Sequence, residues 1–457
     1  MENQEVQVLI QELLSNPEKL RAELEELYPA TIAEALYDLE PEVVQAVLDS
    51  IPPELSGEVF SLLEPDTQDE LVDTLSSDEL AELMTIMSAD DRVDLVKRLP
   101  EEMADAALAL MDDEEREDIT QLSAYEEGTV GSIMTSEYVQ LAANLTAEQA
   151  IAYLRQEAAD SETIYISYIT DKANRLLGSI SLKNLILAKP QEKITEIMNT
   201  DIILIHDQDD QELAADKIAQ YDLLALPVVD SDERLVGIVT HDDVIDVLNQ
   251  EHTEDMEKFM GITGKHEDMA YLRTPIWVHF RNRIGWIMGL AVLGFVSGMV
   301  LKGFEDVLSN LMVLALFMPM LADTGGNMGS QSATVVIRAL ALKEITLRDA
   351  FRVLGKELTV SFMTALILAV IAFVRVWLLA GDSDIPAGIS LVSIGGVISL
   401  ALGLQVVSST AIGSLLPMAA VRLKLDPAVV ASPAITTIVD VTGILIYFSL
   451  ARHMLGV

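Results

Sequence analysis

The sequence predicts a multi-domain membrane protein with an α-superhelical N-terminal domain, a tandem pair of α/β domains and an all-α transmembrane domain with five helices. Three patterns predict this fold class: a helical repeat of twelve residues, a later alternation of strands and helices, and long uncharged apolar runs towards the C-terminus. We expect the helical domain at 1–128, the α/β domains at 129–192 and 193–247, a linking helix at 248–272 and the transmembrane domain at 273–457.

The net charge of −44 lies almost entirely in the first part of the chain. Residues 1–275 carry 17 basic and 63 acidic side chains, whereas the rest of the chain carries 12 and 10. An acidic half of this kind repels nucleic acid and attracts cations, so we expect no nucleic-acid partner. The absence of cysteine excludes disulfides, thiolate metal sites and cysteine catalysis. Met1–Glu40 is acidic and lacks the pattern of a signal peptide.

The repeat places Pro, Ser or Asp near the start of each predicted helix, as at Pro41, Pro53 and Ser77. Pro is tolerated in a first helical turn and breaks a helix interior, while Ser and Asp cap helix N-termini. Each unit therefore predicts one short helix with an apolar face. Stacked units bury faces that no single helix could bury alone, which predicts a scaffold or a sensor with no catalytic residues.

The two α/β domains share one pattern. In the first, a helix capped at Thr146 by a Thr-x-x-Gln box precedes strands at Thr163–Thr170 and Leu176–Ser181. In the second, we expect Asp209 to cap a helix ahead of a strand at Arg234–Thr240. Beyond them, Asp246–Met269 predicts one acidic helix that couples the soluble half to the membrane half.

The run LPVVD at Leu226–Asp230, followed by LVGIVT and then two aspartates, resembles a CBS domain, and the first α/β unit resembles it more loosely. In that family a Gly-x-x-Ser/Thr-x-x-Asp/Asn run holds ribose and phosphate. Gly237, Thr240 and Asp243 match this run. The resemblance implies a pseudo-twofold pair that binds ATP or another adenine nucleotide or, as in many CBS pairs, no ligand. The matching residues of the first unit are Gly178, Ser181 and Asn184.

Five membrane spans are expected, since a bilayer core needs roughly 20 apolar residues in a helix. The connections with the most Lys and Arg lie between the second and third spans and between the fourth and fifth. The positive-inside rule then places the N-terminus in the cytoplasm and the C-terminus outside a bacterial-type plasma membrane. The spans are expected at Ile284–Leu301, from Leu311, at Leu358–Val374, within Ile385–Val421 and at Pro427–Leu450.

The last span contains one ionisable side chain, Asp440, near its middle. A carboxylate at that depth costs about 2.5–3.5 kcal/mol on insertion scales, so it usually faces a watery cavity or a partner. Within this helix a partner is excluded, since no basic residue lies between Asp426 and Arg452. Two interpretations stay open: Asp440 lines a cation path, or it is a structural carboxylate paired with a polar group on another helix.

The second span contains Pro319 and three glycines, which predict a broken helix with free carbonyls at membrane depth. Carbonyl, amide and carboxylate oxygens are ligands suited to Mg²⁺ or Ca²⁺. The alternative is a helix-packing face of the GxxxG type. The polar side chains of Asp323, Asn327 and Gln331 favour the ion path.

The run GGN-x-G-x-QSAT at Gly325–Thr334, together with Asp426-Pro427-Ala428 and Asp440-Val441-Thr442-Gly443, resembles the signature of the MgtE magnesium-channel family. The domain order also matches. The resemblance implies a homodimer in the lipid bilayer whose pore, at the subunit interface, is lined by the second and fifth spans. Ser432 and Asp323 depart from the residue types of other members. The implied pore residues are Asp440, Asn327, Gly325, Gly326, Gly329, Ser330, Thr436 and Ser432.

We therefore expect a Mg²⁺-gated, magnesium-selective channel and not an enzyme, closed by cytoplasmic Mg²⁺ bound to acidic residues. Family sensing positions match Asp243, Glu251, Glu254, Asp255 and Asp426, and on the helical domain we expect Asp90, Asp91 and Asp94.

Other functions remain open at this point. One alternative is a less selective Co²⁺ or Mn²⁺ transporter of the same fold. Another is a membrane nucleotide sensor that moves no ion. An intramembrane metalloenzyme is disfavoured because His266-Glu267 is followed by Ala270 where a second His would stand.

Overall fold

The computed structural model describes residues 6–7, 9–10, 17–37, 39–157, 161–262, 271, 274–380, 385, 388–429 and 432–456. Its contacts divide the chain into two compact units. The first is residues 1–251 with 268–273, and the second is residues 252–267 with 274–457.

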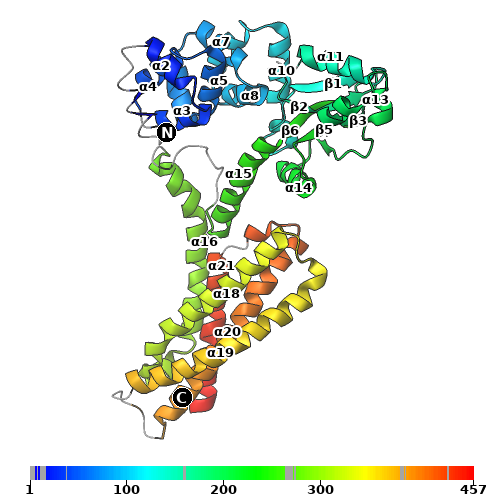
Figure 1. The fold of residues 1–457 in the computed structure, drawn as a ribbon. Helices are drawn as coiled ribbons and strands as arrows, with labels where there is room; N and C mark the ends of the chain where they lie inside the picture. The colour runs from blue at the N-terminus through cyan, green and yellow to red at the C-terminus, as the bar shows by residue number, and fades with distance from the viewer. Residues whose placement is uncertain are drawn as a thin grey trace. The chain divides into compact units, whose positions relative to one another are not determined.

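The first unit opens with a series of short helices (Figure 1). From Pro29 to Asp113 each helix begins twelve residues after the one before it, which confirms the predicted repeat. The helices are α2 (Pro17–Leu24), α3 (Pro29–Leu36), α4 (Pro41–Leu48), α5 (Pro53–Ser61), α6 (Pro65–Val72), α7 (Ser77–Ile86), α8 (Ala89–Arg98), α9 (Glu101–Leu108) and α10 (Asp113–Ser123).

Helices α3 to α6 begin on proline, whose missing N–H would have no intrahelical partner there. Helix α7 begins with a capping box between Ser76 and Glu79. Several of these helices pack on the helix two places further along, as α3 does on α5, α5 on α7 and α8 on α10. This stacking buries apolar side chains such as Phe60 and Met84 in one continuous core.

The α/β domains each contain a three-stranded sheet, in which the first pair of strands is parallel and the second antiparallel. Their elements are η1 (Val130–Ser132), β1 (Tyr138–Ala142), α11 (Ala147–Glu157), β2 (Thr163–Thr170), β3 (Leu176–Ser181), α12 (Leu182–Leu187), α13 (Ile194–Ile197), β4 (Ile205–His206), α14 (Gln211–Tyr221), β5 (Ala225–Val229), β6 (Leu235–Thr240) and α15 (His241–Phe259).

In each α/β domain, the segment ahead of the first strand pairs with the sheet of the other α/β domain. Thr135 bridges to Ile238 of β6, and Asn199 bridges to Ser179 of β3. The exchange ties the two domains together, because each sheet is completed by backbone from its neighbour.

Of the two helix caps predicted in the α/β domains, one is confirmed and one is wrong. The predicted capping box at Thr146 is present, with the Thr146 N–H donating to Gln149 Oε1 at 2.9 Å. The cap of α14, however, is Asp210, which accepts from the Glu212 N–H at 2.9 Å. Asp209 instead accepts the His206 N–H at 3.1 Å, because the chain turns one residue later than the pattern suggested.

The linking helix also differs from its prediction, which ran from Asp246 to Met269. Helix α15 begins at His241, directly after β6, and ends at Phe259. Gly261 follows with φ of +74°, and the Ile262 N–H donates to Glu257 O at 2.9 Å, so a left-handed glycine cap stops the helix. Residues 263–270 of the predicted helix lie outside the described residues.

The second unit contains α16 (Ile276–Lys302), α17 (Glu305–Asn310), η3 (Met312–Phe317), α18 (Met318–Ala341), η4 (Leu347–Asp349), α19 (Ala350–Leu379), α20 (Leu391–Arg422), η5 (Pro427–Val429) and α21 (Ser432–Leu455). Among the described residues, four helical segments are long and apolar enough to cross a membrane, at 276–302, 347–379, 391–422 and 432–455. Helix α18, with 24 residues, is a further long helix of more polar composition.

The expected break in the second span is wrong. Helix α18 runs unbroken through Pro319 and the glycines, and the irregular backbone lies just before it, in the 3₁₀ segment η3. Pro319 stands in the first turn, where its missing N–H does no harm. Gly325, Gly326 and Gly329 are buried and let α18 approach its neighbours, as a GxxxG face does.

The close contact between α18 and α20 predicts that a larger side chain at this point lowers the stability of the second unit. A Cβ added at Gly413 of α20 would lie 2.1 Å from the Gly329 carbonyl oxygen. We expect Gly413→Ala to force α18 and α20 apart and to destabilise the unit by about 1–3 kcal/mol, the usual range for overpacking. Thermal unfolding of the full chain in detergent measures this.

Gly396→Ala is the matched control, because a Cβ at that position of α20 meets nothing within 4 Å. Equal melting temperatures for the two variants would show that the contact between Gly413 and Gly329 does not limit the packing.

Candidate functional site

Asp440 lies in the ninth position of α21, where its Oδ1 atom is buried without a hydrogen-bond partner in the described part of the chain. Its side chain lines a cavity of about 300 Å³ bounded by residues of α16, α18 and α21. Two residues that line the cavity have hydroxyl groups, Ser297 and Tyr447. The Tyr447 hydroxyl donates to Leu314 O at 2.9 Å. Asp440 is the one residue with a carboxylate among those that line the cavity.

The remaining expected pore residues fall on two faces of α18. Asn327 is exposed, and its Nδ2 donates to Asp323 Oδ1 at 3.2 Å, which marks a polar outer face. Gly325, Gly326 and Gly329 lie on the buried face. The structure therefore does not place the glycines and Asn327 on one face of α18.

Each glycine of the buried face meets a specific neighbour on α20 or α21. A Cβ at Gly326 would lie 2.9 Å from Thr436 Cγ2, and one at Gly329 would lie 3.0 Å from Ile435 Cγ2. Beyond them, the Ser330 and Ser432 hydroxyls are 2.7 Å apart. Ser330, Thr436 and Ser432 thus form a contact between α18 and the first two turns of α21, ahead of Asp440 in that helix.

Sequence reasoning missed two polar contacts in this unit. Ser332 Oγ donates to Glu357 Oε2 of α19 at 2.8 Å, and Gln405 Nε2 of α20 donates to Val439 O at 2.9 Å. Both could have been noticed as isolated polar side chains at or within apolar spans, where such groups hold helices together.

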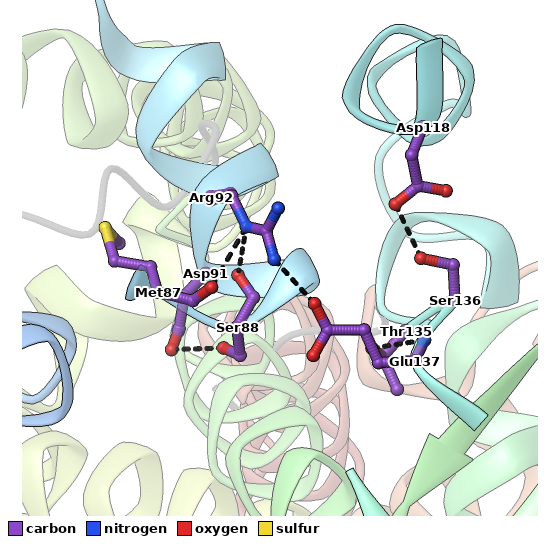
Figure 2. Close-up of polar contacts among 8 residues, drawn as sticks. All are labelled: Met87, Ser88, Asp91, Arg92, Asp118, Thr135, Ser136 and Glu137. Carbon is purple, nitrogen blue, oxygen red and sulfur yellow. Dashed lines mark hydrogen bonds and ion pairs between the residues drawn. The ribbon is translucent and has the colours of Figure 1, made fainter. Parts of the chain in front are cut away.

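A second group of carboxylates lies where the helical domain meets the α/β pair. Arg92 of α8 donates to Glu137 at 2.5 Å, and Ser136 donates to Asp118 of α10 at 2.6 Å (Figure 2). Arg92 is 7% exposed and also donates to the Met87 carbonyl at 3.0 Å. These contacts hold α8 and α10 against the segment that leads into β1.

Acidic side chains crowd around this junction. Burial, together with repulsion from Asp91, raises the pKa of Asp90, whose Oδ1 is buried without a partner in the described structure. Burial, together with repulsion from Asp90, raises the pKa of Asp243 to about 7. Burial, together with repulsion from Asp90, raises the pKa of Glu162 to about 7.

Asp94 belongs to the same acidic group. Burial raises its pKa to about 6, against the opposing attraction of Lys97. Asp90, Asp91, Asp94 and Asp243 are therefore electrostatic neighbours, as the sequence led us to expect, and Glu162 is a member that sequence reasoning missed. No three His, Asp or Glu residues within the described ranges converge closely enough to hold a metal ion directly.

The expected sensing residues on the linking helix divide between two surroundings. Glu251 accepts from Gln211 Nε2 of α14 at 2.8 Å. Lys258 lies 2.7 Å from Glu254 and 3.3 Å from Asp426, which precedes η5. Burial and repulsion from Asp426 raise the pKa of Asp255. Glu254, Asp255 and Asp426 thus gather around one ammonium group.

The nucleotide motif has a structural role in each domain. Thr240 Oγ1 donates to Asp243 Oδ2 at 2.5 Å, which caps α15, and the Asn184 N–H donates to Ser181 Oγ at 3.2 Å. A Cβ at Gly237 would lie 2.7 Å from Met134 Sδ, so packing by itself explains a glycine at this position. Asp243 belongs both to this motif and to the acidic group.

Comparison with known proteins agrees with this domain order. Residues 318–450 match the MgtE family, described as a divalent cation transporter, residues 27–128 match the MgtE intracellular N domain, and 130–190 and 194–250 match CBS domains. The magnesium transporter MgtE of Thermus thermophilus is 40% identical over 346 residues, 76% of this chain and 74% of the relative. That of Bacillus subtilis is 36% identical over 75% of this chain and 73% of the relative.

Solved structures resemble the first unit. The crystal structure of the soluble part of a magnesium transporter has a TM-score of 0.52 and 34% identity, over 55% of this chain and 99% of that one. The cytosolic domain of the Mg²⁺ channel MgtE in complex with ATP has a TM-score of 0.50 and 39% identity, over 53% and 99%. The chain therefore belongs to the MgtE family of magnesium transporters.

Proposed function

We propose that two copies of this chain form a Mg²⁺-selective channel that imports Mg²⁺ through a path lined by Asp440 and closes when cytoplasmic Mg²⁺ binds the acidic residues of the soluble unit. The observation that carries the proposal is the buried Asp440 oxygen, which has no hydrogen-bond partner among the described residues and lies beside a cavity within apolar helices. A carboxylate at that depth is retained where an ion or water reaches it.

A second copy is supported by the outer face of α18. Asp323 and Asn327 are exposed on this helix, and the bilayer core has no water to satisfy their polar groups. A partner subunit or a watery path must therefore cover them. A twofold arrangement would do both, because it brings the same face from each copy to the axis.

Selection would follow from the reluctance of Mg²⁺ to lose its water. The ion usually keeps several water ligands, so two Asp440 carboxylates would hold it through those waters and reject ions of other size and field strength. A divalent ion gains roughly 4.6 kcal/mol per 100 mV of membrane potential, which drives import with the N-terminus in the cytoplasm.

Gating would use the repulsion among the carboxylates. Asp90, Asp243 and Glu162 oppose one another across the junction of the helical domain and the α/β pair. Bound Mg²⁺ removes this repulsion and favours the packed, closed state, whereas its loss lets the junction open. The same logic applies to Glu254, Asp255 and Asp426, where Lys258 already supplies one positive charge.

An adenine nucleotide is proposed as a second regulator, supported by the ATP complex of a similar cytosolic domain. The match of Gly237, Thr240 and Asp243 to the run that holds ribose and phosphate in CBS domains supports a nucleotide site beside Asp243. Because Asp243 also belongs to the acidic group, nucleotide and Mg²⁺ would influence each other's binding.

We expect Asp440→Asn to reduce Mg²⁺ flux into proteoliposomes by at least about tenfold, since it removes the charge that attracts the hydrated ion. Glu305→Gln, at an exposed acid of α17 in the same unit, is the control and keeps its flux. Undiminished flux in the Asp440 variant would contradict the path. Absence of Mg²⁺ flux in the unchanged protein would favour a sensor that moves no ion, and equal Co²⁺ flux would favour a less selective transporter.

Asp90→Asn is expected to raise the Mg²⁺ concentration that halves the flux by about tenfold, because one charged oxygen is lost from the group. Asp105→Asn, at an exposed acid of α9, should leave that concentration unchanged. The measurement is flux against cytoplasmic-side Mg²⁺. Equal inhibition curves for the two variants would remove Asp90 from the sensor.

The response to Mg²⁺ should weaken in mild acid. Carboxylates bind cations when ionised, and raised pKa values near 7 leave Asp243 and Glu162 mostly protonated at pH 6 and mostly ionised at pH 8. The Mg²⁺ concentration that halves the flux should therefore rise by about tenfold at pH 6 for each such carboxylate that the ion requires. A curve that does not move between these pH values would show that these groups do not bind the ion.

A further inference from the structure

Gln405 of α20 is a polar side chain beside the Asp440 turn that the proposed channel does not yet use. It is fully buried, and its Nε2 donates to the carbonyl oxygen of Val439 at 2.9 Å. Val439 immediately precedes Asp440 in α21. The amide thus reaches from one apolar helix to the backbone that carries the carboxylate.

Two glycines on two other helices make room for this amide. A Cβ at Gly325 of α18 would lie 2.4 Å from Gln405 Nε2, and one at Gly443 of α21 would lie 2.5 Å from the same atom. Any larger residue at either position would displace the side chain. Gly443 also lines the Asp440 cavity, so the amide lies directly behind the turn that faces the cavity.

The hydrogen bond has an unusual acceptor. Val439 O also accepts the Thr442 hydroxyl at 2.9 Å, so two side chains donate to the carbonyl just ahead of Asp440. Gln405 Oε1 is buried and has no partner in the described part of the chain. Burying the Gln405 Oε1 atom without a partner costs free energy that an apolar side chain would avoid. The Gln405 amide must therefore offer an advantage other than packing.

We propose that Gln405 is a positioning residue for ion passage: its amide, held between Gly325 and Gly443, fixes the rotation of α21 at Val439 and so aims the Asp440 carboxylate into the cavity. The inference rests on the proposed role of Asp440. It gives Gly325, the first glycine of the GGN run, a role other than binding the ion, namely to leave space for the Gln405 amide.

The first test measures Mg²⁺ and Co²⁺ flux of the full chain in proteoliposomes. Gln405→Leu and the unbranched Gln405→Met should each lower Mg²⁺ flux by about three- to tenfold, the effect of one interhelical hydrogen bond. They should also lower the ratio of Mg²⁺ to Co²⁺ flux and leave the Mg²⁺ concentration for half-closure unchanged. A residue that only stabilises the fold would lower the melting temperature without changing that ratio, and this result would overturn the proposal.

The second test uses the glycine contact. Gly443→Ala should lower the flux, because its Cβ displaces the amide, and adding Gln405→Ala should lower it no further than Gln405→Ala does alone. Gly396→Ala on α20, where a Cβ meets nothing within 4 Å, is the control and keeps its flux. Multiplicative losses in the double variant would show that the two residues act independently and would overturn the proposal.

Asp440→Asn measured in parallel separates the two proposals. If that variant conducts normally, the ion path itself is wrong. If it is silent while Gln405→Leu and Gln405→Met match the unchanged protein in flux and ion ratio, the path stands and the positioning role of Gln405 is wrong.

Discussion

A negative charge removed from water is the constraint on which both units of this protein depend. In the second unit, Asp440 is held among apolar helices with one oxygen unpartnered in the described structure. An isolated carboxylate is strongly disfavoured in such surroundings, so helix packing alone gives no reason to keep it. Under the proposed function, the surrounding helices hold the Asp440 carboxylate in place until a cation binds.

The first unit meets the same constraint with many carboxylates rather than one. Asp90, Asp94 and Asp243 have raised pKa values because burial and mutual repulsion both disfavour their charged forms. Arg92 pairs with one neighbour, Glu137, and Lys97 attracts Asp94, whereas the described residues show no ion pair to Asp90 or Asp243. In the proposed gating, apolar packing would close this junction and repulsion among its carboxylates would open it.

Close helix packing links the glycines to the carboxylate. In a membrane, helices gain little from the hydrophobic effect when they associate, so small residues and interhelical hydrogen bonds decide their positions. Gly329 and Gly413 bring α18 and α20 into backbone contact, and Gln405, which packs on Gly325, connects α20 to α21. The polar outer face at Asp323 and Asn327 is left for whatever covers the helix in the assembly.

Local features of the sequence determined the helical repeat, the strands β2, β3, β5 and β6 and the positions of the long apolar helices. Their signals are short-range: proline at a helix start, the Thr146 capping box and the length of an apolar run depend on neighbours within a turn or two. Tertiary structure alone decided that α18 is continuous, because the packing of Gly329 on α20 and α21 offsets the poor helix propensity of glycine. It also decided that Glu162 joins Asp90 and that Gln405 reaches Val439, since those partners are far apart in the chain and meet only after the helices and sheets have packed.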